Sequence, residues 1–203
     1  MSSSAPLGQL RFVVVDTEMT ALGKRSNRLL ALGAIAMQGP SILLGEQFYR
    51  LVNPGVPVPA AGVLVHKLRP DDVAGGDDPH EVLREFLRFA EGSVLVGHFL
   101  AFDLDLLKRE MSDMGVRLEH PAVDTAKVYR WILERRHRGA DLGHAGENLD
   151  LTTVAKAYQL EMQDAHHALD DAFLTARRWQ RMLHDLASFK VESLGGLLRF
   201  GKP

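Results

Sequence analysis

The stretch FVVVDTE (residues 12–18) runs from a β-branched and aromatic block directly into two carboxylates. A short continuous apolar run of this kind is typical of a buried strand. Side chains two apart in a strand project from the same face, so we expect Asp16 and Glu18 to point into one site where this strand ends. Such a pair, taken alone, is more often a solvated strand end. The buried block ahead of it favours a site at the edge of the core.

Apolar runs and turns further along the chain predict the rest of the architecture. Residues 29–37 and 42–52 are two more strands, and the short turn QGPS between them predicts antiparallel pairing. After residue 60, helical patterns alternate with short apolar strands. We expect strands at residues 94–96 and near residue 123, and helices over residues 60–66, 79–90, 101–114, 125–136, 149–158 and 168–186. This order indicates a single α/β domain with a mixed five-stranded sheet flanked by helices.

Length and composition set the domain organisation. The chain has 203 residues, of which 46% are hydrophobic and 25% are charged, and this is enough for one folded domain. We expect residues 1–9 to form a flexible tail, residues 10–186 to form the domain, and residues 187–203 to form a C-terminal extension. No run approaches the ~18 apolar residues of a membrane span, and the opening lacks the pattern of a secretory signal. We therefore expect a cytoplasmic protein without a membrane partner.

Composition also excludes several kinds of chemistry. The chain has no cysteine, which rules out disulfides, thiolate catalysis and zinc-thiolate sites. The net charge is −2, from 24 Lys+Arg against 26 Asp+Glu, and this argues mildly against a high-affinity binder of duplex nucleic acid. It does not exclude an enzyme that acts on nucleic acid, because carboxylates committed to divalent cations are electrically balanced once the ions bind.

Two more acidic positions stand near predicted helix starts. Asp103 falls in the first turns of the helix that follows the strand at residues 94–96, where a carboxylate can also serve as a simple helix-dipole charge. Residues 166–171 read HHALDD and open the last predicted long helix. Asp170 and Asp171 could be first-turn charges, and His166 could be a loop residue. Two histidines and two aspartates in six residues nevertheless exceed what capping requires.

Together, these motifs resemble those of the DEDDh exonucleases, the superfamily of bacterial proofreading subunits, ribonuclease T and oligoribonuclease. FVVVDTEMTAL (residues 12–22) resembles the first motif, and LVGHFLAFDLDLL (residues 95–107) is similar to the second, His-x-x-x-Phe-Asp. HHALDD resembles the third, in which a His precedes an Asp by five positions. Residues 28–33 and 65–68 match weaker blocks of the same family. The resemblance covers about residues 11–185 and implies a ribonuclease H-like fold.

The resemblance implies a 3′→5′ exonuclease that uses two Mg²⁺ or Mn²⁺ ions. Hard divalent cations prefer oxygen ligands, and two of them can stabilise both the attacking and the leaving oxygen at phosphorus. By resemblance, the metal-binding carboxylates would be Asp16, Glu18, Asp103 and Asp171. His166 would be the general base, since a histidine with a pKa near ~6.5 can take a proton from water at neutral pH. The same comparison implies substrate-binding roles for Thr20, Leu22, His66, His98 and Phe102.

Several positions depart from the family pattern. Ala21 replaces a Gly, Ala31 replaces a Glu and Phe99 replaces an Asn, which leaves the substrate preference open. Phe102 could stack on a base, or it could be a core aromatic residue beside Asp103. The basic stretch at residues 130–138 could follow the phosphates of a single strand, but a solvated helix face is the simpler interpretation.

The predicted function is release of nucleoside 5′-monophosphates from the 3′ end of single-stranded DNA, with short RNA as the second choice. A DNA polymerase is a partner that the resemblance allows, and the sequence does not define an oligomeric state. The alternative is a catalytically silent relative that binds nucleic acid or a partner protein. Degenerate relatives usually lose a carboxylate or the base first, and all five residues are present here.

Overall fold

The structure, a computed structural model, describes residues 1–21, 26–137, 149–160 and 167–203. Its centre is a five-stranded sheet in the order β3-β2-β1-β4-β5. The strands are β1 (Arg11–Met19), β2 (Leu29–Gln38), β3 (Ser41–Leu51), β4 (Val94–Gly97) and β5 (Ala122–Asp124). β2 pairs antiparallel with both β1 and β3, whereas β4 runs parallel to both β1 and β5. The predicted mixed sheet and the antiparallel pairing across residues 38–41 are therefore confirmed.

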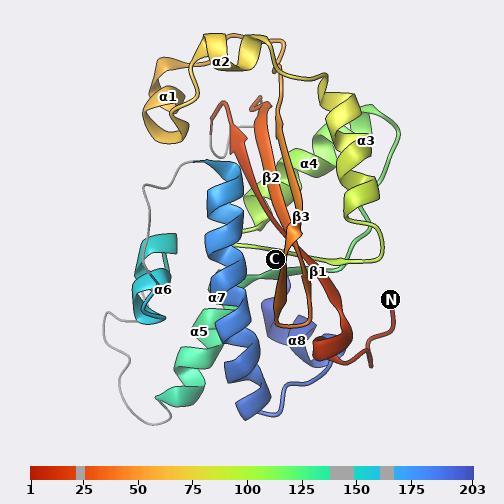
Figure 1. The fold of residues 1–203 in the computed structure, drawn as a ribbon, viewed down its shortest axis with the longest axis vertical. Helices are drawn as coiled ribbons and strands as arrows, with labels where there is room; N and C mark the ends of the chain where they lie inside the picture. Colours follow the sequence, from red (N-terminus) through yellow and green to blue (C-terminus); the bar gives the residue numbers. More distant parts are fainter. Residues whose placement is uncertain (22–25, 138–148, 161–166) are drawn as a thin grey trace.

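Eight α-helices are present in the described part of the chain, and Figure 1 shows how they surround the sheet. They are α1 (Ala60–His66), α2 (Pro70–Ala74), α3 (Pro79–Phe89), α4 (Ala101–Asp113), α5 (Thr125–Arg136), α6 (Leu151–Ala157), α7 (Ala168–Ser188) and α8 (Leu194–Gly201). The long helix α7 lies against β1 and β2, with α5 and α6 beside it. No helix among the described residues has both the length and the apolar character that a membrane crossing needs.

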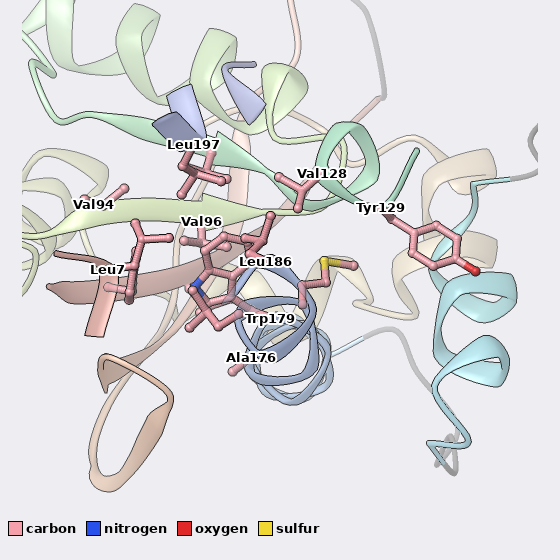
Figure 2. Packing of buried hydrophobic residues seen from close by; sticks show 14 of the residues in the cluster. Leu7, Val94, Val96, Val128, Tyr129, Ala176, Trp179, Leu186 and Leu197 are labelled. Carbon is pink, nitrogen blue, oxygen red and sulfur yellow. The ribbon is translucent and has the colours of Figure 1, made fainter. Parts of the chain in front are cut away.

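Alternation along the strands divides the core into two layers, because successive side chains in a strand point to opposite faces. Phe12 and Val14 pack in one cluster with residues of α5, α7 and α8. Val13 and Val15 pack in the other cluster with residues of α3 and α4. In the first cluster Trp179 of α7 is fully buried and meets the ring of Phe12 edge-on, with the centroids 5.5 Å apart. Figure 2 shows Trp179 surrounded by aliphatic side chains of this cluster.

The two ends of the described chain pack together, which the sequence did not predict. The N–H of Leu7 donates to the carbonyl of Glu192 (2.8 Å), and the N–H of Leu194 donates to the carbonyl of Ala5 (3.0 Å). Leu194 and Leu197 of α8 are buried in the first core cluster. The C-terminal extension expected at residues 187–203 therefore contains a helix that covers part of the core. The short helix α2 was not predicted either.

Candidate active site

The C-terminal end of β1 carries the first two predicted metal ligands. Asp16 and Glu18 are half-buried and lie opposite Gly33 and Ala31 of β2. Directly opposed residues of an antiparallel pair share a face, so these four positions look towards the same side of the sheet. That side is the one covered by α7. The predicted delivery of both carboxylates to one place is therefore consistent with the register of the sheet.

Gly33 allows the start of α7 to approach the sheet closely. A Cβ at Gly33 would lie 2.3 Å from the carbonyl carbon of Ala168 and 2.3 Å from the nitrogen of Leu169, both of them backbone atoms. No side chain fits in that space, so only glycine lets the helix begin directly against β2. Asp171 stands in the first turn of this helix and is buried. The contact therefore brings Asp171 to the face of the sheet that carries Asp16 and Glu18.

Three of the four predicted metal carboxylates meet at this point. Asp16, Glu18 and Asp171 each offer one oxygen atom, and these atoms all lie within 4.8 Å of one another. Asp103 is not part of that group and enters from α4 on the opposite face. Its Oδ1 accepts hydrogen bonds from the backbone N–H of Thr17 (3.0 Å) and from the Thr17 hydroxyl (2.6 Å). Since Thr17 stands between Asp16 and Glu18, these bonds fasten Asp103 to the same strand end.

The electrostatics of the cluster show that the carboxylates are costly to keep ionised without a counter-charge. Burial, followed by the charges of Asp171 and Asp103, raises the pKa of Glu18 to about 8. Burial and then the charges of Asp103, Glu18 and Asp171 raise the pKa of Asp16 well above its ordinary value, while Arg178 opposes this rise. Burial raises the pKa of Asp103 to about 7 against the effect of the Thr17 bonds. Clustered oxygen donors that repel one another suit a hard divalent cation.

Thr20 and His66, predicted to bind substrate, lie near the end of β1. The Thr20 hydroxyl accepts a hydrogen bond from the N–H of Arg28 (2.9 Å) and so joins the ends of β1 and β2. His66 is buried at the end of α1, and its Nδ1 accepts from the N–H of Leu68 (3.1 Å). The His66 Nε2 and the Thr20 carbonyl oxygen are each 2.9 Å from the place that a Cβ on Gly62 would take. The two residues are therefore neighbours, and their contact with substrate stays a prediction.

Phe102 is 46% exposed, so the alternative that it is a core aromatic residue is wrong. Its neighbour Phe99 is 42% exposed and has a positive φ of 53°. The backbone N–H of Phe99 donates to Oδ1 of Asp124 (3.1 Å), which helps to hold this turn. Phe102 adjoins Asp103 at the start of α4, and Phe99 lies against His98, with the ring centroids 4.6 Å apart. Both rings are partly exposed, and either one can offer a face to a base.

His98 uses both ring nitrogens within the protein. Its Nε2 is 2.7 Å from the carbonyl oxygen of Leu149, and its Nδ1 is 2.9 Å from the hydroxyl of Thr125. A carbonyl only accepts, so Nε2 carries the proton and Nδ1 accepts from Thr125. Burial is the main reason that the pKa of His98 falls to about 4, which keeps the ring neutral. The structure places His98 as a link between β4, α5 and the segment before α6, and a direct contact with substrate remains a prediction.

Two predicted residues, His166 and Leu22, lie outside the described residues. Two others that the sequence did not single out stand close to the cluster. Tyr49 of β3 lies opposite Gly33 and stacks on His167, with the ring centroids 4.3 Å apart and the planes at 27°. Arg178 of α7 is fully buried. Its spacing of seven residues from Asp171 was a signal, because residues seven apart lie on the same face of a helix.

The fold and the site define a class of protein: a mixed-sheet α/β domain that presents a partly buried carboxylate centre at the end of its first strand. The sequence model described as Exonuclease matches residues 13–178. The chain belongs to this exonuclease family, which confirms the resemblance drawn from its motifs.

Its relatives include parts of DNA polymerase III. A DNA polymerase III subunit epsilon-like protein of Rhodobacter capsulatus is 34% identical over 197 residues, covering 97% of this chain and 27% of the relative. A PolC-type DNA polymerase III of Caldanaerobacter subterraneus is 31% identical, covering 90% of this chain and 12% of the relative. DNA polymerase III subunit epsilon of Aquifex aeolicus is 27% identical, covering 86% and 81%. The chain thus spans only a small part of the first two relatives.

Solved structures share the fold at low identity. Exonuclease I of E. coli in complex with a dT13 oligonucleotide superposes with a TM-score of 0.77 and 16% identity, covering 90% of this chain and 43% of that one. Exonuclease X in complex with 5′ overhanging duplex DNA gives a TM-score of 0.63 and 19% identity, covering 87% and 92%. These likenesses confirm the predicted ribonuclease H-like fold.

Proposed function

We propose that this chain is a metal-dependent 3′→5′ exonuclease that releases nucleoside 5′-monophosphates. The observation that carries the proposal is the meeting of Asp16, Glu18 and Asp171, whose oxygen atoms lie within 4.8 Å of one another. Membership of the exonuclease family supports the same activity. A cluster of this kind has no structural purpose that the fold requires, because mutual repulsion and burial make it destabilising without a cation.

The donor set fits divalent cations. Asp16, Glu18 and Asp171 would hold them, with Asp103 beside them through its bonds to Thr17. Mg²⁺ and Mn²⁺ both accept carboxylate oxygens, and two such ions would supply positive charge for the phosphate and for the attacking and leaving oxygens. The absence of cysteine from the chain is in keeping with a site that uses oxygen ligands.

The remaining chemistry falls to side chains of this chain. His166 would accept a proton from the attacking water as its oxygen bonds to phosphorus. The bond between phosphorus and the 3′ oxygen of the penultimate nucleotide then breaks, and that oxygen takes up a proton from solvent. The products are a nucleoside 5′-monophosphate and a strand one nucleotide shorter. Phe102, exposed beside Asp103, would stack on a base near the 3′ end.

Single-stranded DNA is the proposed first substrate, and short RNA is the second. One terminal nucleotide has to reach a centre set among the ends of β1, α4 and α7, which a frayed single strand does most easily. The fold neighbour Exonuclease I was solved with a dT13 oligonucleotide, which supports this choice. A relative that is DNA polymerase III subunit epsilon and another that is epsilon-like support a DNA polymerase as partner, with a proofreading role for this domain.

The test follows mononucleotide release from oligonucleotides labelled at the 3′-terminal nucleotide, with Mg²⁺, Mn²⁺ or EDTA. Single-stranded DNA, duplex DNA and RNA of the same sequence are compared side by side. Asp171→Asn removes one charge from the centre with little change of shape, and it should abolish release. Asp105→Asn is the matched control, because Asp105 is an exposed carboxylate on α4 that pairs with Arg109 instead.

Metal-dependent release by the wild-type protein and by Asp105→Asn, but not by Asp171→Asn, is the expected result. Binding of the oligonucleotides without release under any metal would favour the catalytically silent alternative. Equal release by Asp171→Asn and wild type would show that the centre has been misplaced.

A further inference from the structure

Arg178 is a fully buried cation that the proposed reaction does not use. Its Nε donates to the carbonyl of Leu174 (3.3 Å), its Nη1 to the carbonyl of Leu151 (3.0 Å) and its Nη2 to the hydroxyl of Thr175 (2.6 Å). These three acceptors are neutral, so the hydrogen bonds satisfy donors without balancing the charge. A buried guanidinium is strongly destabilising unless negative charge lies nearby.

The direction of the Arg178 side chain indicates which carboxylates supply the negative charge. Arg178 bonds groups three and four residues earlier in α7, so its side chain runs back towards the start of the helix. Long side chains in helices commonly take this direction. The start of α7 carries Asp171, and Gly33 holds that start against the strand opposite Asp16. The guanidinium therefore extends along α7 towards the end that carries Asp171, and the charges of Asp171 and Asp16 act on it.

The pKa values of Arg178 and Asp16 show that the two groups affect each other. Burial lowers the pKa of Arg178 to about 10, while the charges of Asp171 and Asp16 act to keep it protonated. Arg178 is in turn the group that opposes the raised pKa of Asp16. At neutral pH the guanidinium is still protonated. The attraction between the guanidinium and the carboxylates thus offsets part of the free-energy cost of burying both.

We infer that Arg178 is the resident counter-cation of the carboxylate centre, a positioning residue that holds the centre together in the metal-free protein. The inference rests on the metal site of the proposed function. Arg178 and a divalent cation would neutralise the same carboxylates. The positive charge of Arg178 should therefore weaken the binding of the divalent cation. Removing the charge of Arg178 should therefore destabilise the metal-free protein and tighten metal binding, because coupling between two sites is reciprocal.

The test compares neutral and charged replacements of Arg178. Arg178→Met and Arg178→Gln remove the charge, Gln keeping an amide donor, whereas Arg178→Lys keeps the charge without the guanidinium fork. Arg136→Met is the matched control, because Arg136 pairs with Asp185 (2.5 Å) near the far end of α7. Thermal unfolding in EDTA and the Kd for Mn²⁺ by calorimetry are measured for all of them.

Both neutral variants should unfold at a lower temperature in EDTA than Arg178→Lys. Mn²⁺ should raise their unfolding temperatures by more than it raises that of Arg178→Lys. Their Kd for Mn²⁺ should be at least about fivefold lower than that of Arg178→Lys, from repulsion between a unit charge and a divalent ion inside a protein. Arg136→Met should lower stability without changing the Kd. Arg178→Gln decides the outcome if Arg178→Met does not fold.

Equal Mn²⁺ affinity in the neutral and charged variants would overturn the inference and leave Arg178 as an anchor for the backbone of α6. Weaker Mn²⁺ binding in the neutral variants would overturn it as well. Failure of the proposed function looks different: the wild-type protein would bind no Mn²⁺, or its affinity would be unchanged by Asp171→Asn.

Discussion

Substitution of Gly33 by Ala should damage the active centre without touching any of its carboxylates. The new methyl would stand 2.3 Å from two backbone atoms of α7, where ordinary contact begins at 3.4 Å. The start of the helix must therefore move by about 1.1 Å, the difference between these distances, since backbone atoms cannot rotate out of the way. Overpacking of this kind costs about 1–3 kcal/mol, which corresponds to roughly 2–12 °C in Tm for a domain of this size.

The same movement displaces Asp171 from Asp16, and a misplacement of about 1 Å can lower a rate by ~10²-fold. Gly45→Ala is the matched control, because Gly45 lies in β3 and a Cβ there would meet no atom within 4 Å. We expect Gly33→Ala to lose both stability and mononucleotide release, and Gly45→Ala to keep both. Thermal unfolding and the release assay measure the two effects. A Gly33→Ala protein with the Tm and rate of Gly45→Ala would refute the proposed close contact of α7 with β2.

Three further predictions concern the centre itself. Asp171→Ala should abolish release while the metal-free protein unfolds at the same or a higher temperature, because one of the repelling carboxylates is gone while Asp16 still offsets the charge of Arg178; near wild-type activity would contradict this. His166→Ala should lower the rate by ~10²–10⁴-fold and His167→Ala far less, and the reverse order would show that the base has been misassigned. In EDTA the free energy of unfolding should fall as pH rises from about 4.5 to about 8, because the folded pKa of Glu18 is raised from 4.5 to about 8 and the folded protein therefore binds the proton more tightly. Denaturant titrations at several pH values give the free energy of unfolding of the wild type and of Glu18→Gln. The same dependence of this free energy on pH in the two proteins would contradict the prediction.

The parts of the fold that could be predicted are those where local pattern and burial agree. The apolar block before Asp16 is a strand because its side chains alternate between two buried layers. α7 was predicted because its apolar face repeats at helical spacing over many residues. α8 contains Gly195 and Gly196, which have low helix propensity, and it forms because leucines pack on the core and Ser193 caps its start. The cap is a local signal, but the packing of the leucines on the core is not, and the two glycines obscure the helix in the sequence.

In the candidate site, too, residues with a local sequence pattern could be predicted, and contacts that depend on tertiary packing could not. Spacing within one strand placed Asp16 and Glu18 together, and the family motifs added Asp103 and Asp171. Contacts between distant elements could not be predicted, such as the bonds from Thr17 to Asp103 and the burial of Arg178. An arginine in a helix is usually a surface charge. The seven-residue spacing places Arg178 on the same helix face as Asp171, but its burial becomes evident only when the packing of α7 on the sheet is known.

Location of bound metal is the most direct test of the carboxylate centre. Crystals soaked in Mn²⁺ and measured at the manganese absorption edge give anomalous peaks only where the ion binds. We expect a peak in contact with the carboxylates of Asp16, Glu18 and Asp171, with Asp103 close by or joined to it through water. Carboxyl groups more than about 8 Å from one another, a span that two ions cannot bridge, or peaks only at other places, would contradict the shared site.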